Sequence, residues 1–206
     1  PAMSLGHRLP TDTDDGLLLI ISGPSGVGKT TITRGVERSI PDSVFSVSWT
    51  PRPPTKADVE GVDYHFVSDE EFERMKARGG FIETAGLYGK KYGTPRDWVF
   101  EQLKRGRLVI LEIDVEGARQ VKSHVPDAYG IFILPPSEQT LLERLRLRKR
   151  EDESAIQGRF GAARLEIAQG RECGVYDTFI VNDQVDDSIR RAIEVVNEIR
   201  AARRAR

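Results

Sequence analysis

Short apolar runs alternate with amphipathic and charged stretches along most of the chain. The run from Leu17 to Ile21 is short, β-branched at its end and bounded by polar residues, which is typical of a strand buried on both faces. The same pattern predicts strands at 17–21, 44–48, 108–114, 131–134 and 178–181, and helices at about 30–39, 116–122, 138 onward and 154–167. Because strands that alternate with helices are joined by right-handed crossovers, we predict a three-layer α/β fold around a parallel sheet.

The two ends of the chain differ in their patterns. Residues 1–15 are polar and aperiodic, so we expect a disordered N-terminal extension outside the fold. Apolar residues recur at helical spacing from Ile189 to Ile199, and Asp186 or Asp187 is expected to cap the start of this terminal helix.

The pattern changes between residues 45 and 105. A proline-rich loop covers 50–56, and short strands are expected at 63–67 and 81–85 around a small helix that begins after Ser68 and ends at Gly79. We interpret 45–105 as a small β-rich insertion, which is a natural place for a site that binds a phosphate acceptor. The main fold would then comprise 16–44, 106–137 and 168–200, with a helical lid at about 138–167.

Composition narrows the class of protein. The 206 residues carry 31% charged side chains that balance to a net charge of −1, which favours neither nucleic acid nor an acidic membrane as a partner. A single cysteine, Cys173, cannot form an internal disulfide, and no apolar run reaches the roughly 20 residues that span a membrane. We therefore expect a soluble cytoplasmic protein.

One glycine-rich motif directly follows the first predicted strand. Gly23, Pro24, Ser25, Gly26, Val27, Gly28, Lys29 and Thr30 fit the phosphate-loop pattern G-x-x-x-x-G-K-[ST] at every fixed position, and Thr31 continues into a helix. Glycines let backbone N–H groups point inward, Lys29 adds a positive charge, and the Thr30 hydroxyl is suited to Mg²⁺. The alternative is a turn that only links a strand to a helix. The strand before and the helix after the motif favour a site for the phosphates of a nucleoside triphosphate.

Two further groups of charged residues are candidates for chemistry. Glu112 and Asp114 are two residues apart on a predicted strand and would leave its carboxyl end on the same face, one near Mg²⁺ and the other facing the acceptor. A structural ion pair with a distant arginine is the alternative. Arg144 and Arg148 belong to a basic run that is either a solvated helix face or an arm that closes over the triphosphate, and the phosphate loop favours the arm.

These residues resemble the guanylate kinase family over nearly the whole folded chain, from about Leu17 to Ile199. Beside the phosphate loop, the matching stretches are 45–52, 61–67, 81–83, 92–94, 110–117 and 180–183. The resemblance implies a P-loop kinase that transfers the terminal phosphate of ATP to GMP or dGMP with Mg²⁺. Residues 45–105 would then form the GMP-binding subdomain, and a homo-oligomer is possible.

The resemblance also implies roles for individual residues. Guanine would contact Ser48, Glu83 and Asp114, and the acceptor phosphate would contact Arg52, Tyr64 and Tyr92, with Thr94 where the family often has serine. The closing arm would supply Arg144, Arg148 and Arg159, of which Arg148 lies with Asn182 where the family holds adenine. With Lys29 and Arg52, these arginines are the predicted catalytic residues, and Thr30 with Glu112 is the predicted metal site.

Two alternatives remain open. A family member that phosphorylates a sugar phosphate would keep the phosphate loop but have no use for Ser48, Glu83 and Asp114 together. A non-catalytic binding module of the same fold would tolerate damage to the loop, whereas this chain retains Gly28, Lys29 and Thr30.

Position 55 yields a testable prediction. The family usually has a second phosphate-binding arginine three residues after Arg52, and this chain has Thr55. We expect weak GMP binding unless Lys56 substitutes for the missing charge. Thr55→Arg should therefore lower the KM for GMP in steady-state kinetics, and an unchanged KM would count against this expectation.

Glu112 is a second position at which the sequence departs from the usual family residue, because aspartate is common there.

Overall fold

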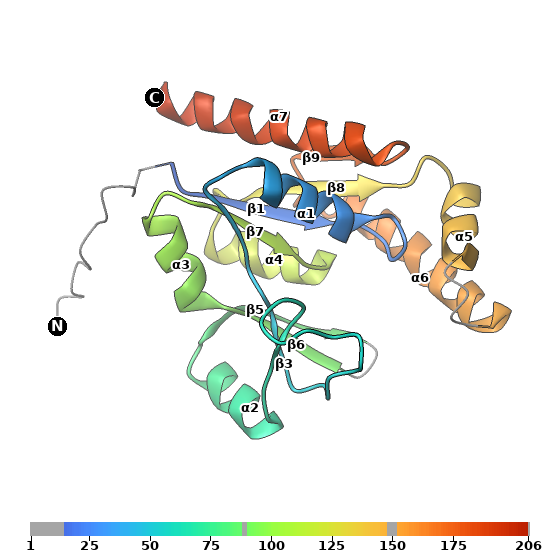
Figure 1. Cartoon of the computed structure of the whole chain (residues 1–206), viewed down its shortest axis with the longest axis horizontal. Helices are drawn as coiled ribbons and strands as arrows, with labels where there is room; N and C mark the ends of the chain where they lie inside the picture. Colours follow the sequence, from blue (N-terminus) through green and yellow to red (C-terminus); the bar gives the residue numbers. More distant parts are fainter. Residues whose placement is uncertain (1–14, 88–89, 148–151, 206) are drawn as a thin grey trace.

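A computed structural model describes residues 15–87, 90–147 and 152–205. Its centre is a five-stranded sheet with the strand order β2-β7-β1-β8-β9, and every neighbouring pair is parallel (Figure 1). The strands are β1 (Leu17–Ser22), β2 (Ser43–Phe45), β7 (Leu108–Glu112), β8 (Tyr129–Leu134) and β9 (Thr178–Val181). The predicted α/β fold around a parallel sheet is confirmed.

Strand β1 supplies side chains to both faces of the sheet. Leu17, Leu19 and Ile21 pack with α1 (Lys29–Ser39) and α7 (Val185–Arg204). Leu18 and Ile20 pack on the other face with α3 (Arg96–Lys104) and α4 (Val115–His124). Because successive side chains of a strand point to opposite faces, one short apolar run fills two cores.

A second sheet interrupts the chain between β2 and β7. Its order is β4-β3-β6-β5, formed by β3 (Trp49–Thr50), β4 (His65–Phe66), β5 (Phe81–Leu87) and β6 (Lys90–Pro95). Helix α2 (Asp69–Ala77) packs on it through Phe72, whose ring centroid lies 4.8 Å from that of Phe81. Ser68 caps α2 as predicted, accepting a hydrogen bond from the backbone N–H of Glu71.

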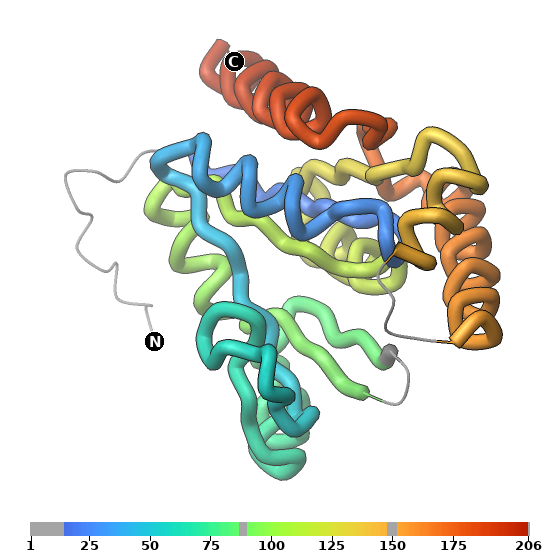
Figure 2. Tube along the Cα trace, turned by 45° about the vertical axis from the view of Figure 1, so that its right-hand side comes forward, coloured from blue at the N-terminus to red at the C-terminus, as the bar shows by residue number. Residues whose placement is uncertain are grey.

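Helices α5 (Glu138–Leu147) and α6 (Glu153–Glu172) form an arm beside the carboxyl ends of the parallel strands. Figure 2 shows the arm and the second sheet on two sides of this edge. Helix α6 was expected to end near Ile167 but continues to Glu172, because Ile167 and Cys173 pack against the core beneath β8. One continuous helix therefore reaches from the arm into the main fold.

Three other expectations about the elements are wrong. Of the predicted strand 44–48, only Val44 and Phe45 belong to a strand, because β2 ends at Phe45 and residues 46–48 connect it to β3 in the other sheet. The predicted strand 63–67 contains only His65 and Phe66, since a turn occupies the residues before them. Neither Asp186 nor Asp187 caps α7; they lie in its first turn, and Gln184 occupies the capping position.

The basic C-terminal segment bonds to the protein itself. Arg200 donates to both carboxylate oxygens of Asp42 and is 11% exposed in its side chain. Arg203 donates to the carbonyl oxygens of Gly16 and Asp127, and Arg204 pairs with Asp15. Asp15 therefore belongs to the fold, contrary to expectation, and residues 1–14 lie outside the described ranges. No helix in those ranges has both the length and the apolar composition needed to cross a membrane.

The close packing of α6 on the sheet yields a prediction. Alanine normally stabilises a helix interior over glycine by about 0.5–1 kcal/mol. A Cβ at Gly170 would lie 2.4 Å from the ring of Phe132, which is fully buried and packs against the rings of Tyr176 and Phe179. We expect Gly170→Ala to lower the free energy of unfolding by about 1–3 kcal/mol in urea titrations.

The same helix provides the matched control. A Cβ at Gly161 would meet no atom within 4 Å, so Gly161→Ala should raise the free energy of unfolding by up to about 1 kcal/mol. Equal stabilisation by both substitutions would contradict the predicted contact with Phe132.

Candidate active site

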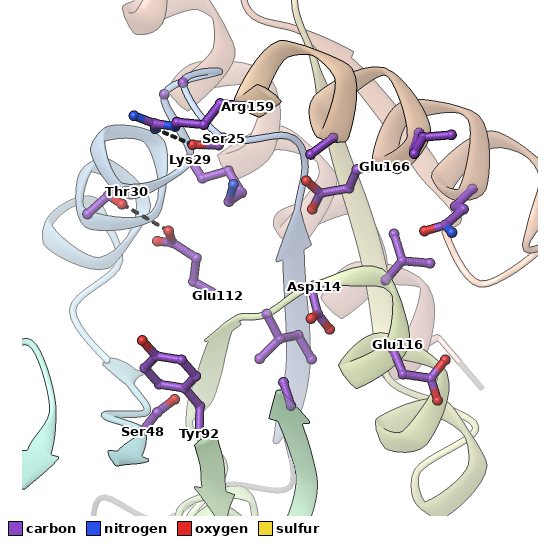
Figure 3. Close-up of a pocket in the computed structure, with 18 of the residues that line it drawn as sticks. Ser25, Lys29, Thr30, Ser48, Tyr92, Glu112, Asp114, Glu116, Arg159 and Glu166 are labelled. Carbon is purple, nitrogen blue, oxygen red and sulfur yellow. Dashed lines mark hydrogen bonds between the residues drawn. The ribbon is translucent and has the colours of Figure 1, made fainter. Parts of the chain in front are cut away.

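A cleft of about 1110 Å³ opens at the carboxyl ends of β1 and β7. Its walls come from the glycine-rich loop and α1, from the turn between β7 and α4, from the second sheet and from α6 (Figure 3). Ligands of parallel α/β folds bind at this edge of the sheet. The cleft brings together thirteen of the predicted site residues: Ser25, Gly26, Gly28, Lys29, Thr30, Thr31, Ser48, Tyr64, Glu83, Tyr92, Glu112, Asp114 and Arg159.

The glycine-rich loop wraps around the start of α1. Gly26 and Gly28 have φ angles of +87° and +100°, which side chains disfavour, and α1 begins directly afterwards at Lys29. The first N–H groups of a helix lack helical partners and favour an anion. Lys29 donates from Nζ to the carbonyl oxygens of Gly23 and Pro24, which keeps its positive charge at the loop.

Asn182 supports the loop from below. Its side-chain Nδ2 donates to the carbonyl oxygen of Val27 at 2.7 Å, and its Oδ1 accepts from the hydroxyl of Ser188 at 3.0 Å. Asn182 is buried, and a Cβ at Gly28 would lie 2.7 Å from its Nδ2. The loop therefore requires glycine at position 28, and β9 holds the loop through this amide.

The predicted arginines of the arm lie in different environments. Arg159 of α6 donates to the Ser25 hydroxyl at 2.6 Å and so reaches the loop across the cleft. Arg144 of α5 instead donates to the backbone carbonyls of Asn182 and Asp183. Arg148 lies outside the described residues. In this structure the arm thus presents Arg159 to the loop, while Arg144 joins α5 to the end of β9.

Glu112 and Asp114 do not share a strand. Strand β7 ends at Glu112, and Asp114 is the N-cap of α4, where its Oδ1 accepts from the backbone N–H of Gly117 at 2.7 Å. The prediction that both leave one face of a strand is therefore wrong. Both still line the cleft: Glu112 accepts from the Thr30 hydroxyl at 2.9 Å, while the Oδ2 of Asp114 accepts from none of the described residues.

Glu83 is a buried carboxylate at the opposite wall. Its side chain comes from β5, the residue is 3% exposed, and its Oε1 accepts from the Thr94 hydroxyl at 2.6 Å. Its Oε2 is buried and has no partner among the described residues. Burial raises the pKa of Glu83 to about 7, with the Thr94 hydrogen bond acting against this shift and the Asp114 charge adding to it.

Arg52 lies beside the cleft rather than on its wall. Both of its Nη atoms donate to the carboxylate of Asp58, and its guanidinium carbon lies 5.1 Å from the ring centroid of Tyr64. Tyr64 in turn packs against Tyr92 at 5.3 Å between ring centroids. Burial raises the pKa of Tyr64, so its hydroxyl stays protonated and can donate a hydrogen bond.

Sequence reasoning missed Glu166 of α6. Its carboxylate points into the cleft between Lys29 and Asp114 (Figure 3). Burial raises its pKa to about 7, which the charge of Lys29 opposes. Glu166 follows Arg159 by seven residues, a spacing that places both on one face of a helix. This spacing from Arg159 is the feature of the sequence that could have identified Glu166 as a candidate site residue.

Comparison with known proteins agrees with this geometry. The family model described as guanylate kinase matches residues 16–199. The guanylate kinase of Coxiella burnetii is 43% identical over 90% of this chain and 89% of its own length, and that of Thermosynechococcus vestitus is 47% identical over 84% and 90%. The crystal structure of guanylate kinase from Anaplasma phagocytophilum superposes with a TM-score of 0.71 at 31% identity, covering 90% of this chain and 86% of that one. The chain belongs to the guanylate kinase family.

Proposed function

We infer that this protein is an ATP-dependent kinase that phosphorylates GMP and dGMP to the diphosphates, in purine nucleotide metabolism. One observation carries the choice of acceptor: the buried Oε2 of Glu83 has no partner among residues 15–87, 90–147 and 152–205, and Glu83 lines the cleft that also contains the glycine-rich loop. A buried acceptor without a donor is costly, so a ligand that brings N–H groups to it gains affinity.

Guanine matches the acidic wall. Its N1–H and its exocyclic amino group are adjacent donors, and Glu83 and the Oδ2 of Asp114 would accept from them, with Ser48 nearby in the same cleft. Adenine lacks the N1 proton and would leave Glu83 unpaired. A site built to accept that hydrogen bond rejects the analogue without it by orders of magnitude.

We assign the phosphates to the basic and hydroxyl groups at either end of the cleft. The loop from Gly23 to Thr31 would hold the triphosphate, with Lys29 and Arg159 stabilising the charge that spreads over the transferred group. Tyr64, Tyr92 and Arg52 would hold the phosphate of GMP, and Thr94 would keep Glu83 in place. The GMP phosphate is already an anion, so transfer requires alignment and charge neutralisation without a general base.

The adenine end and the lid complete this assignment. Arg148 and Asn182 are proposed for adenine, although the side chain of Asn182 already bonds to Val27 and Ser188, so a contact with the base would use its remaining N–H. Arg144 would move from the carbonyls near Asn182 to the phosphates when the arm closes.

Thr30 and Glu112 fit Mg²⁺. A hydroxyl and a carboxylate 2.9 Å apart are hard oxygen donors of the kind that Mg²⁺ prefers, and Mg²⁺ usually completes its shell with phosphate and water. Bound there, the ion would neutralise phosphate charge. Glu112 reaches the Thr30 hydroxyl directly, so the longer side chain is compatible with this role. We also propose a cytoplasmic location without nucleic-acid or membrane partners, which the net charge of −1 and the small-molecule substrates support.

The first test is a coupled ADP-release assay with GMP, dGMP, AMP and sugar phosphates. We expect activity with the two guanine nucleotides and little with the others, because only guanine satisfies Glu83. Lys29→Ala should lower kcat by about 10²–10³, the usual effect of removing one group that stabilises the transition state. The exposed Lys104→Ala is the control and should retain activity. Equal activity with a sugar phosphate, or none with GMP, would contradict the proposal.

The second test follows the pKa of Glu83. Burial raises this pKa to about 7, so the group gains its proton as the pH falls through 7 and then accepts one hydrogen bond fewer from guanine. The KM for GMP should therefore rise between pH 8 and pH 6. Glu83→Gln keeps the titration of the GMP phosphate but removes that of the carboxyl. At pH 8 the KM of the Glu83→Gln variant for GMP should be higher than that of the wild-type protein, and it should depend less on pH. Parallel pH profiles of KM for the variant and the wild-type protein would count against the role of Glu83.

A further inference from the structure

The loop between β3 and β4 holds Arg52 in one orientation. Asp58 accepts from Arg52 twice, with Nη1 bonded to Oδ2 at 2.9 Å and Nη2 bonded to Oδ1 at 3.0 Å. Both side chains are largely buried, at 10% and 15% exposed. Nη1 also donates to the carbonyl oxygen of Pro53 at 2.9 Å, which uses its second proton. Asp58 therefore pairs with the end of the guanidinium that carries the two Nη atoms.

This end-on pairing leaves the other side of the guanidinium available. A guanidinium has five N–H donors, and the Asp58 and Pro53 contacts account for three of them. The remaining two are Nε–H and the second proton of Nη2, which lie side by side. None of the described residues accepts from Nε. Two parallel N–H groups match two oxygens of a phosphate, the geometry in which arginine binds this group most tightly.

Aromatic rings restrain the same guanidinium. Its carbon lies 5.1 Å from the ring centroid of Tyr64 and 5.3 Å from that of Phe66. Tyr64 and its neighbour Tyr92 line the cleft, so the free side of Arg52 and two phenol hydroxyls belong to one region. Arginine stacks well on aromatic faces because its charge is delocalised and weakly hydrated.

Asp58 also bonds to the backbone of position 55, where the sequence departs from the expected family motif. Its Oδ2 accepts from the backbone N–H of Thr55, the residue that stands where a second arginine is usual in the family. Thr55 has no charged side chain. Binding of the acceptor phosphate would therefore depend on the orientation of the Arg52 guanidinium. The pKa of Asp58 is held well below its usual range by Arg52, so the carboxylate stays ionised during activity measurements.

We propose that Asp58 is a positioning residue for the acceptor phosphate: it orients Arg52 so that Nε and Nη2 face the phosphate of GMP. This inference rests on the proposed function and identifies a residue to which that function assigns no role. Asp58 also repels the phosphate, but the guanidinium lies between the two groups, and solvent at the cleft weakens repulsion over that distance. Losing the orientation of Arg52 would weaken GMP binding more than this repulsion does. An unrestrained arginine side chain loses the conformational entropy of several rotatable bonds when it binds.

The experiment compares Asp58→Asn with the wild-type protein in steady-state kinetics and in calorimetric titrations of GMP without ATP. We expect the KM and Kd for GMP to rise about tenfold, the size of losing one hydrogen bond to a charged group, and the KM for ATP to stay within about twofold. Asp58→Glu should recover part of the loss. Asp63→Asn is the matched control: it removes a carboxylate from the same loop that bonds to the backbone of Val59 and does not contact Arg52.

A double-mutant cycle separates orientation from general support of the loop. In an Arg52→Ala background, Asp58→Asn should have little further effect on the affinity for GMP, because Asp58 acts through Arg52. Additive losses, or an unchanged or lower Kd in the single variant, would overturn the inference. If the wild-type protein binds GMP but fails to phosphorylate it, the proposed function fails while the titration still decides the role of Asp58.

Discussion

The position of β1 at the centre of the parallel sheet is the constraint on which the rest of the structure depends. Its side chains alternate between two cores, so the strand cannot shift by one residue without exposing both sets. The fixed strand delivers the glycine-rich loop to one point at the edge of the sheet. Asn182, at the end of β9, then holds the loop through Val27. The loop is therefore held by the protein itself, through β1 before it and Asn182 beside it.

The second sheet forms the wall of the cleft opposite that loop. Glu83 sits on β5, buried beside Thr94 of β6, and its carboxylate is expensive to keep ionised there. The antiparallel pairing of β5 with β6 fixes both side chains. A ligand that supplies hydrogen-bond donors to Glu83 lowers the free-energy cost of the buried carboxylate. A ligand without such donors does not. In the proposed function, selectivity for guanine would thus follow from an unfavourable free state rather than from many favourable contacts.

Helix α6 connects the arm to the main fold. Its first half carries Arg159 to the loop, and its last residues pack beneath β8 through Gly170. Because the helix is continuous, Arg159 and Gly170 belong to one element. Glu166 lies between these two parts and faces Lys29 and Asp114 in the cleft.

The sequence by itself determined the parallel fold, the phosphate loop and most of the residues that line the cleft. These depend on local signals: the buried run at 17–21, the glycine spacing of the loop and the ordered set of family motifs. Helix ends with local caps, such as Ser68, were also predictable. Such features can be predicted from the sequence because residues close together in the chain specify each of them.

Only the tertiary structure decided features that depend on residues far apart in the chain. It ended β2 at Phe45 and led the chain into a second sheet from Trp49, made Asp114 a helix cap, and placed Glu166 in the cleft. It also paired Arg200 with Asp42, and a run of basic residues at the end of a chain gives no sign of its partner. Burial and partner choice are set by packing between elements, and a linear pattern does not encode them residue by residue.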